Sequence, residues 1–239
     1  MAFYLIGLGL NTKSISLEGL ERAKKSKEIY LENYTVDFPY KKEELEKLIG
    51  QKIIELGREK VEKEEFLEKA KRQEISLLVY GDCLSATTHI SLIEKCIKEK
   101  IKFQIIHAES ILNAISNTGL QLYKFGKTAS MPAWRENWKP DSFIDYVKEN
   151  KSIDAHTLLL VDIGLEFNKA REELEEAGKN KNISFDKIIV CSCLGTQKEK
   201  IIYQNIKNIK KVEKPYCIII PAKMHFLEEE SLKMIVRNK

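Results

Sequence analysis

The chain has 239 residues, of which 43% are hydrophobic and 32% are charged, and its 40 basic and 36 acidic side chains leave a net charge of +4. This length and composition indicate a globular protein of one large or two small domains and exclude a largely disordered chain. So small a net charge gives no indication of a nucleic-acid partner. Because no apolar run has transmembrane length and no signal-peptide pattern opens the chain, we expect a cytoplasmic protein without a membrane partner.

The five cysteines indicate reduced thiols, because an odd number without regular spacing does not form a disulfide framework. Cys191 and Cys193 lie in an apolar run, where alternation would place both thiols on one face of a strand. A zinc site needs about four ligands, and no second Cys/His pair has suitable spacing. We therefore expect buried thiols and no bound metal.

In the first half of the chain, apolar runs typical of strands alternate with amphipathic runs typical of helices. We expect strands at Phe3–Ile6, Ile29–Glu32, Lys52–Leu56, Ile75–Tyr80 and Phe103–Ile106, and helices from Ser16 (with a capping-box-like start), over Lys41–Ile49, Val61–Arg72 and Ile90–Ile97, and from Ser110. This alternation predicts a mainly parallel sheet with right-handed crossovers, forming an N-terminal α/β domain of residues 1–117.

After a predicted loop or linker at 117–127, the order of elements changes. We expect strands at His156–Val161, Lys187–Ser192, Lys200–Tyr203 and Tyr216–Ile220, and helices that end at Asn150 (capped by Asp141 or Ser142), over Lys169–Ala177 and over Met224–Val236. These elements predict a second α/β domain, residues 118–239, with a mixed sheet. A crevice between two such domains is a common place for a small-molecule site.

The segment Gly81–His89 joins a predicted strand to a predicted helix and contains Asp82, Ser85 and Thr87. A carboxylate and backbone N–H groups at the carboxyl end of a strand are typical of ligand sites in open α/β sheets. Gly81 could equally form a tight turn, with Ser85 or Thr87 capping the helix. Local sequence does not decide between these interpretations.

The pair Gly7 and Gly9 after the first strand resembles the start of a dinucleotide-binding fingerprint. The pattern is incomplete, because position 12 is Thr and the predicted helix begins later. The histidines lack metal-ligand spacing, and a hydrogen-bonded structural role is the default for each. His89 and His225 fit that default least, since each ends a strand-to-helix turn.

Several blocks together resemble one family, the diphthine synthases, which belong to the tetrapyrrole-methylase-like enzymes. The resemblance runs in order from residue 2 to about 235, and the blocks that carry it are Tyr4–Leu10, Gly81-Asp82 with Ala86-Thr87-Thr88-His89, Thr118–Lys127, Asn137–Phe143, His156–Leu159 and Pro221–His225. The Ala-Thr-Thr-His and Thr-Gly-Leu-Gln-Leu-Tyr sequences are its most specific parts.

The resemblance implies two α/β domains with S-adenosyl-L-methionine held in the cleft between them and S-adenosyl-L-homocysteine as product. It also implies repeated methylation of the amino group on a modified histidine of translation elongation factor 2, giving diphthine on the route to diphthamide, and a homodimer. Positioning of the amine against the sulfonium can supply most of the rate, so no catalytic base is assigned.

By motif position, the resemblance implies a set of cofactor contacts, namely Leu10, Asp82, Ser85, Ser110, Ile111, Val161, Leu194 and His225. The four aliphatic members are equally consistent with core packing. Cys83 stands where the family usually has Pro, and Ser85 replaces a usual apolar residue. Alternative functions are methylation of tetrapyrroles or ribosomal RNA within the same fold, or regulation by nucleotide binding without catalysis.

Overall fold

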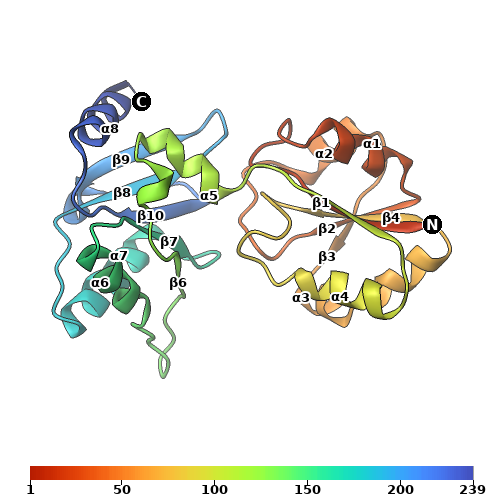
Figure 1. Cartoon of the computed structure of the whole chain (residues 1–239), viewed down its shortest axis with the longest axis horizontal. Helices are drawn as coiled ribbons and strands as arrows, with labels where there is room; N and C mark the ends of the chain where they lie inside the picture. The colour runs from red at the N-terminus through yellow and green to blue at the C-terminus, as the bar shows by residue number, and fades with distance from the viewer. Residues whose placement is uncertain (239) are drawn as a thin grey trace. The chain divides into compact units, whose positions relative to one another are not determined.

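The computed structural model describes residues 1–238, in two compact units that divide between Leu112 and Asn113 (Figure 1). Each unit contains its own five-stranded sheet, parallel in the first and mixed in the second. The two α/β units confirm the predicted fold class. The proposed domain limits, 1–117 and 118–239, differ from this division by the short segment 113–117. Within residues 1–238, no helix combines the length and the apolar character that crossing a membrane requires.

The first unit is a doubly covered parallel sheet with the strand order β3-β2-β4-β1-β5. Its elements are β1 (Ala2–Gly7), α1 (Leu17–Lys25), β2 (Glu28–Glu32), α2 (Lys42–Ile49), β3 (Ile54–Leu56), α3 (Arg58–Lys63), the 3₁₀ helix η1 (Glu65–Lys71), β4 (Glu74–Val79), α4 (Ile90–Lys98) and β5 (Phe103–Ile106). Helices α1 and α2 cover one face, and α3 and α4 cover the other (Figure 1).

Both faces of this sheet are apolar, which is why its strands read as continuous hydrophobic runs. In β1, Phe3 and Leu5 belong to the core cluster under α3 and α4, whereas Tyr4 and Ile6 belong to the cluster under α1 and α2. Strands β4 and β1 are neighbours at the centre of the sheet. After β1 the chain crosses to β2 on one side of this pair, and after β4 it crosses to β5 on the other side. Open α/β sheets bind ligands at such a switch point, beyond the carboxyl ends of the strands.

The predicted helix over Val61–Arg72 is wrong. Helix α3 ends at Lys63, and Glu64 adopts a left-handed conformation (φ 58°) that turns the chain into η1. The turn lets η1 bury Phe66 and Leu67 in the core under the sheet. The capping box at Ser16 is half formed: its hydroxyl accepts a hydrogen bond from the N–H of Gly19 (3.0 Å), a residue without a side chain to reciprocate.

The second unit is built on a mixed sheet with the order β6-β7-β10-β8-β9, in which only β6 and β7 pair in parallel. Its elements are α5 (Ile111–Ala114, which crosses the division), the 3₁₀ helices η2 (Ile115–Thr118) and η3 (Leu122–Lys124), β6 (Ala129–Met131), α6 (Phe143–Ser152), β7 (Thr157–Val161), α7 (Phe167–Asn180), β8 (Lys187–Ser192), β9 (Lys200–Asn205), the 3₁₀ helix η4 (Ile206–Asn208), β10 (Tyr216–Ile220) and α8 (Phe226–Asn238).

Three local predictions fail in this unit. The segment 117–127 is not a plain loop, since it includes η3 and the end of η2. Of the two predicted caps of α6, Asp141 and Ser142, the residue at the N-cap is Ser142, which is in a helical conformation and makes no side-chain cap, and Asp141 accepts from the N–H of Ile144 (3.0 Å) through its main-chain carbonyl. Strand β8 ends at Ser192, and Cys193 is left-handed (φ 50°), so Cys191 and Cys193 do not share a strand face. The prediction of reduced, buried thiols is confirmed, because all five cysteines are free and buried.

Gly126 is required by the buried side chain of Asn150. The Asn150 amide accepts from the N–H of Lys127 (2.9 Å) and donates to the carbonyl of Lys127 (2.9 Å) and the hydroxyl of Thr157 (3.0 Å). A Cβ at position 126 would lie 2.1 Å from Asn150 Oδ1. The amide therefore fastens the end of the 118–127 block to α6 and β7, and only glycine leaves room for it.

We therefore predict that Gly126→Ala lowers the free energy of unfolding of the second unit by about 2 kcal/mol, because the added methyl group displaces the Asn150 amide. Both tryptophans, Trp134 and Trp138, lie in this unit, so their fluorescence during denaturation reports its unfolding alone. Asn150→Ala is the control background: without the amide, the methyl group at position 126 has room, so Gly126→Ala should cost less there. An equal shift of the midpoint in both backgrounds would contradict the assignment.

Candidate functional site

The carboxyl ends of β4 and β5 meet over the end of β1, and Gly7 makes this approach possible. A Cβ on Gly7 would lie 2.8 Å from the carbonyl oxygen of Gly81 and 3.0 Å from the Cβ of Ala108. Gly9 (φ 70°) exchanges two hydrogen bonds with Gly81, at 3.1 and 3.0 Å. The two glycines thus serve chain packing at the switch point rather than opening a helix on a dinucleotide phosphate.

Asp82 ties these strand ends together. Its Oδ1 accepts hydrogen bonds from the N–H of Leu84 (3.1 Å) and the hydroxyl of Ser85 (3.0 Å). Its Oδ2 lies 2.7 Å from Nδ1 of His107 and 3.3 Å from the N–H of Ala108. Four donors occupy the four acceptor positions of the carboxylate, so Asp82 is the centre of the turn after β4 and holds it to the segment after β5.

The environment keeps Asp82 ionised although its side chain is only 9% exposed. Burial alone raises the pKa of its carboxyl, but the hydrogen bonds from His107 and the other donors outweigh burial and leave the pKa below its ordinary value. The His107 side chain, by contrast, is 66% exposed. The geometry is a buried carboxylate that orients a solvent-facing imidazole.

Four other predicted residues lie on this edge of the first unit. Leu10 is buried, and its carbonyl accepts a hydrogen bond from the hydroxyl of Tyr80 (3.2 Å). Ser85 is half-buried, and the Ser110 hydroxyl accepts from the N–H of Leu112 (3.2 Å) at the start of α5. Ile111 is half-buried beside it. The edge therefore collects five of the eight predicted cofactor contacts, whose role in binding stays a prediction.

The second unit divides the other three predicted residues between opposite ends of its sheet. Val161 is the last residue of β7, and Leu194 follows the end of β8. The ends of both strands lie beside the start of β10, because Leu160 pairs with Cys217 and Ser192 pairs with Tyr216. His225 follows the last residue of β10, which pairs with the start of β7. A five-residue strand spans about 13 Å between these ends. Val161 and Leu194 thus share one end of the sheet, and His225 lies beyond the other.

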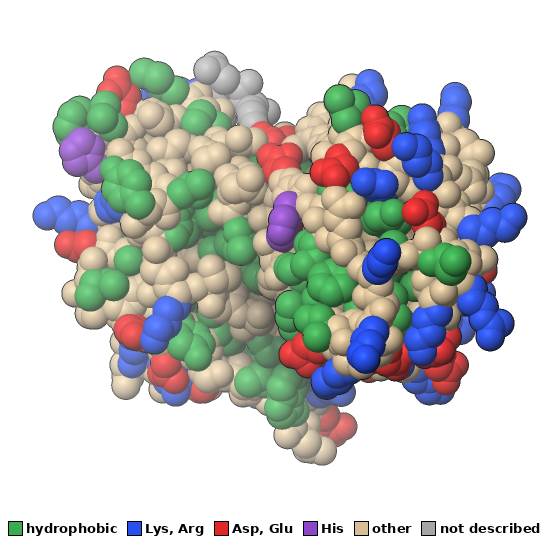
Figure 2. All heavy atoms as spheres, turned by 45° about the vertical axis from the view of Figure 1, so that its right-hand side comes forward, with side chains coloured by type: hydrophobic (Ala, Val, Ile, Leu, Met, Phe, Trp, Pro, Cys, Tyr) green, Lys and Arg blue, Asp and Glu red, His purple; other side chains and the backbone are tan. Residues whose placement is uncertain are grey.

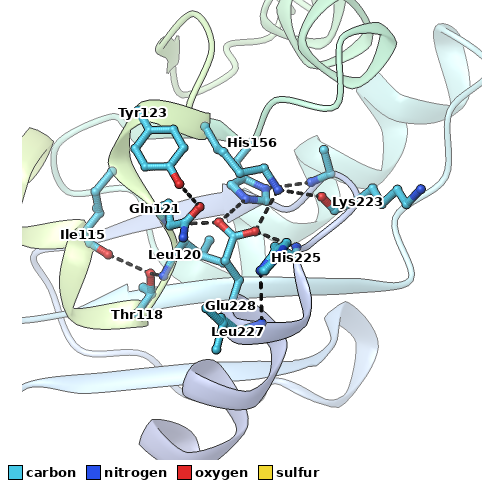
Figure 3. A network of polar contacts seen from close by, with 12 residues as sticks. Ile115, Thr118, Leu120, Gln121, Tyr123, His156, Lys223, His225, Leu227 and Glu228 are labelled. Atoms are coloured by element: carbon cyan, nitrogen blue, oxygen red, sulfur yellow. Dashed lines mark hydrogen bonds and ion pairs between the residues drawn. The ribbon is translucent and has the colours of Figure 1, made fainter.

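A buried network that centres on Glu228 holds the segment of His225 in place (Figure 3). The fully buried Glu228 carboxylate accepts from the ammonium of Lys124 (2.7 Å), the N–H of Gln121 (2.9 Å), the N–H of His225 (2.8 Å) and Nε2 of His156 (3.2 Å). Burial by itself raises the pKa of Glu228, but these donors, Lys124 first, lower it to about 2.

His156 is the neutral partner in this network. Its Nδ1 accepts a hydrogen bond from the N–H of Ala222 (3.0 Å), so the proton sits on Nε2 and points to Glu228. Burial lowers the pKa of His156 by more than Glu228 raises it. One carboxylate thereby joins three separate stretches of sequence, 121–124, 156 and 222–228.

Sequence reasoning missed the roles of Glu228, His156 and His107. Glu228 lies in a Glu-rich helix start, where nothing in the sequence separates it from its exposed neighbours. His156 and His107 were visible only as histidines beside strands. His89, singled out for its place at a turn, is buried, with Nε2 3.4 Å from the Tyr34 hydroxyl, and burial lowers its pKa.

Among the described residues, one group could bring three metal-ligand atoms within 4.8 Å of one another: Asp82, Cys83 and His107. Its chemistry does not favour a metal. Burial raises the pKa of the Cys83 thiol to about 12, so sulfur keeps its proton, and the thiol faces the carbonyls of Leu5 and Ile106. A metal would also have to displace the donors that already occupy Asp82.

Comparisons with known proteins agree on one family. The family model for tetrapyrrole (corrin/porphyrin) methylases matches residues 2–210. The chain is 39% identical to the diphthine synthase of Methanocaldococcus jannaschii over 98% of each chain, and 48% identical to the diphthine methyl ester synthase of Schizosaccharomyces pombe over 67% of this chain and 58% of that one. A crystal structure of diphthine synthase superposes with a TM-score of 0.90 at 31% identity, covering 99% of this chain and 96% of the other.

The Glu228 network predicts an acid-dependent stability. Its carboxyl has a pKa of about 2 in the folded chain against an ordinary 4.5, so its contribution is complete above about pH 4.5 and disappears as the pH falls towards 2. We expect Glu228→Gln to lower the free energy of unfolding of the second unit by about 3 kcal/mol at pH 7 and by progressively less below pH 4.5.

Tryptophan fluorescence during denaturation measures this difference. Glu149→Gln is the control: it removes the same charge from an exposed ion pair with Lys127, whose contribution should be below about 1 kcal/mol. A Glu228→Gln deficit that stayed constant from pH 7 to pH 3 would show that the carboxylate's charge is not what stabilises the network.

Proposed function

Because this chain belongs to the diphthine synthases, within the tetrapyrrole methylase family, we propose that it uses S-adenosyl-L-methionine to methylate repeatedly the amino group of a modified histidine on translation elongation factor 2. The product would be diphthine, an intermediate of diphthamide biosynthesis. The chain is a methyltransferase, as its relatives are. The observation that carries the proposal is the strand edge organised by Asp82, at the switch point of a parallel sheet.

The residues on that edge fit an adenosyl-bearing cofactor. Gly81 is left-handed (φ 69°), and the nearest atom to a Cβ there would be 3.8 Å away, so its bare backbone has room beside it. Leu10 is almost fully buried and would offer its main chain, while half-buried Ser85 and Ile111 would offer side chains. The cofactor supplies an electrophilic methyl group on a sulfonium; the chain's residues bind and orient it. Val161, Leu194 and His225 remain proposed contacts from the second unit.

The proposed partners follow from the chemistry and from the surface. Leu122, Tyr123, Phe226 and Leu227 are exposed apolar side chains of the second unit close in sequence to the Glu228 network, and Tyr123 is 82% exposed. Figure 2 shows hydrophobic side chains on the visible face of both units, interspersed with Lys/Arg and Asp/Glu side chains of both signs. These features support protein partners, the elongation factor and a second copy of the chain, rather than nucleic acid. Reduced cysteines support a cytoplasmic setting.

Incubation with methyl-labelled S-adenosyl-L-methionine and elongation factor 2 that carries the unmethylated precursor tests the proposal. We expect mass spectrometry to find added methyl groups on the modified histidine and none on elongation factor that lacks the modification. The number of methyl groups per histidine then distinguishes repeated from single transfer. Absence of transfer by protein that binds the cofactor would overturn the proposed function.

The Asp82 clamp predicts a loss of cofactor affinity in Asp82→Ala. The variant leaves four donors without their shared acceptor and releases the turn after β4, so Kd for S-adenosyl-L-methionine should rise about tenfold or more, since a hydrogen bond to a charged group contributes roughly 1.5–3 kcal/mol. Calorimetric titration measures Kd, and far-UV circular dichroism checks the fold. Asp145→Ala, which removes an exposed carboxylate from the other unit, should leave Kd unchanged. Unchanged affinity in Asp82→Ala would show that cofactor binding does not depend on the turn that Asp82 holds.

A further inference from the structure

We propose that His107 is the proton acceptor of the methyl transfer: Nε2 removes the proton from the substrate ammonium, and Asp82 holds the imidazole in the orientation that this requires. The inference rests on the proposed function, because it supplies a step that an amine acceptor needs. It adds a catalytic residue to a site in which the sequence indicated none.

The position of His107 is the first support. It directly follows β5, on the strand edge that also holds Leu10, Asp82 and Ser110. The His107 side chain is 66% exposed, whereas the side chain of its partner Asp82 is only 9% exposed. An exposed imidazole at the carboxyl end of a parallel strand, beside the proposed cofactor site, is accessible to an amine that approaches from solvent.

The hydrogen bond to Asp82 is the second support, because it fixes which ring nitrogen is basic. An ionised carboxylate only accepts hydrogen bonds, so the contact of 2.7 Å between Nδ1 and Oδ2 places the proton on Nδ1. The lone pair of the neutral ring is then on Nε2, which has no hydrogen-bond partner among residues 1–238. A buried Asp that orients a His through Nδ1 is the arrangement in which imidazole acts as a general base.

The charged groups around His107 do not compete for this role. The segment after β4 contributes Asp82 and the protonated thiol of Cys83. The segment of His107 itself contributes Glu109, which is exposed, and Leu8–Leu10, which follow β1, have no titratable side chain. Asp82 is thus the buried charge that faces the ring, and it stabilises the imidazolium that proton transfer creates.

An ammonium has no lone pair, so His107 Nε2 first takes one N–H proton and becomes imidazolium. The amine lone pair then forms the N–C bond while the C–S bond breaks. The electron pair of the C–S bond stays on sulfur, which becomes the neutral thioether of S-adenosyl-L-homocysteine. The imidazolium releases its proton to water. Because an alkyl amine is mostly protonated at neutral pH, each round of methylation needs one such deprotonation.

His107→Asn tests the assignment, since the Asn amide can still donate to Asp82 where Nδ1 did but cannot accept a proton. With saturating cofactor, we expect its single-turnover rate at pH 7 to be about 100-fold below that of the unsubstituted chain. The deficit should shrink at least tenfold between pH 7 and pH 9, because the amine then loses its proton to solvent. Added imidazole should restore part of the rate at pH 7.

A structural role for His107 gives a different result. Equal rates for the variant and the unsubstituted chain, or a deficit that is constant with pH and matched by weaker cofactor binding, would overturn the assignment. Lys102→Gln, at the opposite end of β5, is the control and should change neither the rate nor Kd. If the unsubstituted chain transfers no methyl group at any pH, the proposed function fails, which is distinct from loss of activity in His107→Asn alone.

A spectroscopic measurement tests the same inference without catalysis. In ¹⁵N-labelled protein at high pH, the imidazole of His107 should carry its proton on Nδ1, and Asp82→Asn should abolish that preference. A His107 ring protonated on Nε2 in the unsubstituted chain would overturn the proposal whatever the activity, because the solvent-facing nitrogen would then have no lone pair to offer.

Discussion

The Asp82 carboxylate is the interaction on which the rest of the first unit's site depends. It spans from the end of β4 to the end of β5 across the end of β1, and it can do so because Gly7 leaves no side chain between them. Through its four donors, Asp82 holds the turn after β4, which contains Ser85, next to the imidazole of His107, which follows β5. A glycine and a carboxylate therefore set the geometry that a ligand would meet at the switch point.

In the second unit, another buried carboxylate, that of Glu228, likewise holds separate stretches of the chain together. Glu228 gathers Lys124, His156 and the backbone of His225, which come from three distant stretches of sequence. The blocks that made the family recognisable, from Thr118 to Lys127 and from Pro221 to His225, thus meet through a network of internal hydrogen bonds to Glu228. Their sequence specificity is explained in part by packing, as Gly126 and Asn150 also illustrate.

Much of the fold could be predicted, because strand periodicity and apolar runs locate β1, β4, β7, β8 and β10 to within a residue or so. Failures occurred where long-range packing overrides local pattern, as at Glu64, whose left-handed turn serves the burial of Phe66, and at Cys193, where the chain leaves the strand. The Asp82 turn was visible in sequence, but its partner His107 was not, since 25 residues separate them. The burial of Glu228 could not be predicted either, because most of its hydrogen-bond donors lie far from it in the sequence.

We propose that the edge organised by Asp82 holds the cofactor. Hydrogen–deuterium exchange with and without S-adenosyl-L-homocysteine tests this most directly, because it needs neither the protein substrate nor activity. We expect slower exchange in the ligand-bound protein over residues 81–89 and 107–112, with little change over 54–56, the strand β3 at the far edge of the same sheet. Unchanged exchange over 81–89 and 107–112, at a ligand concentration that saturates binding, would contradict it.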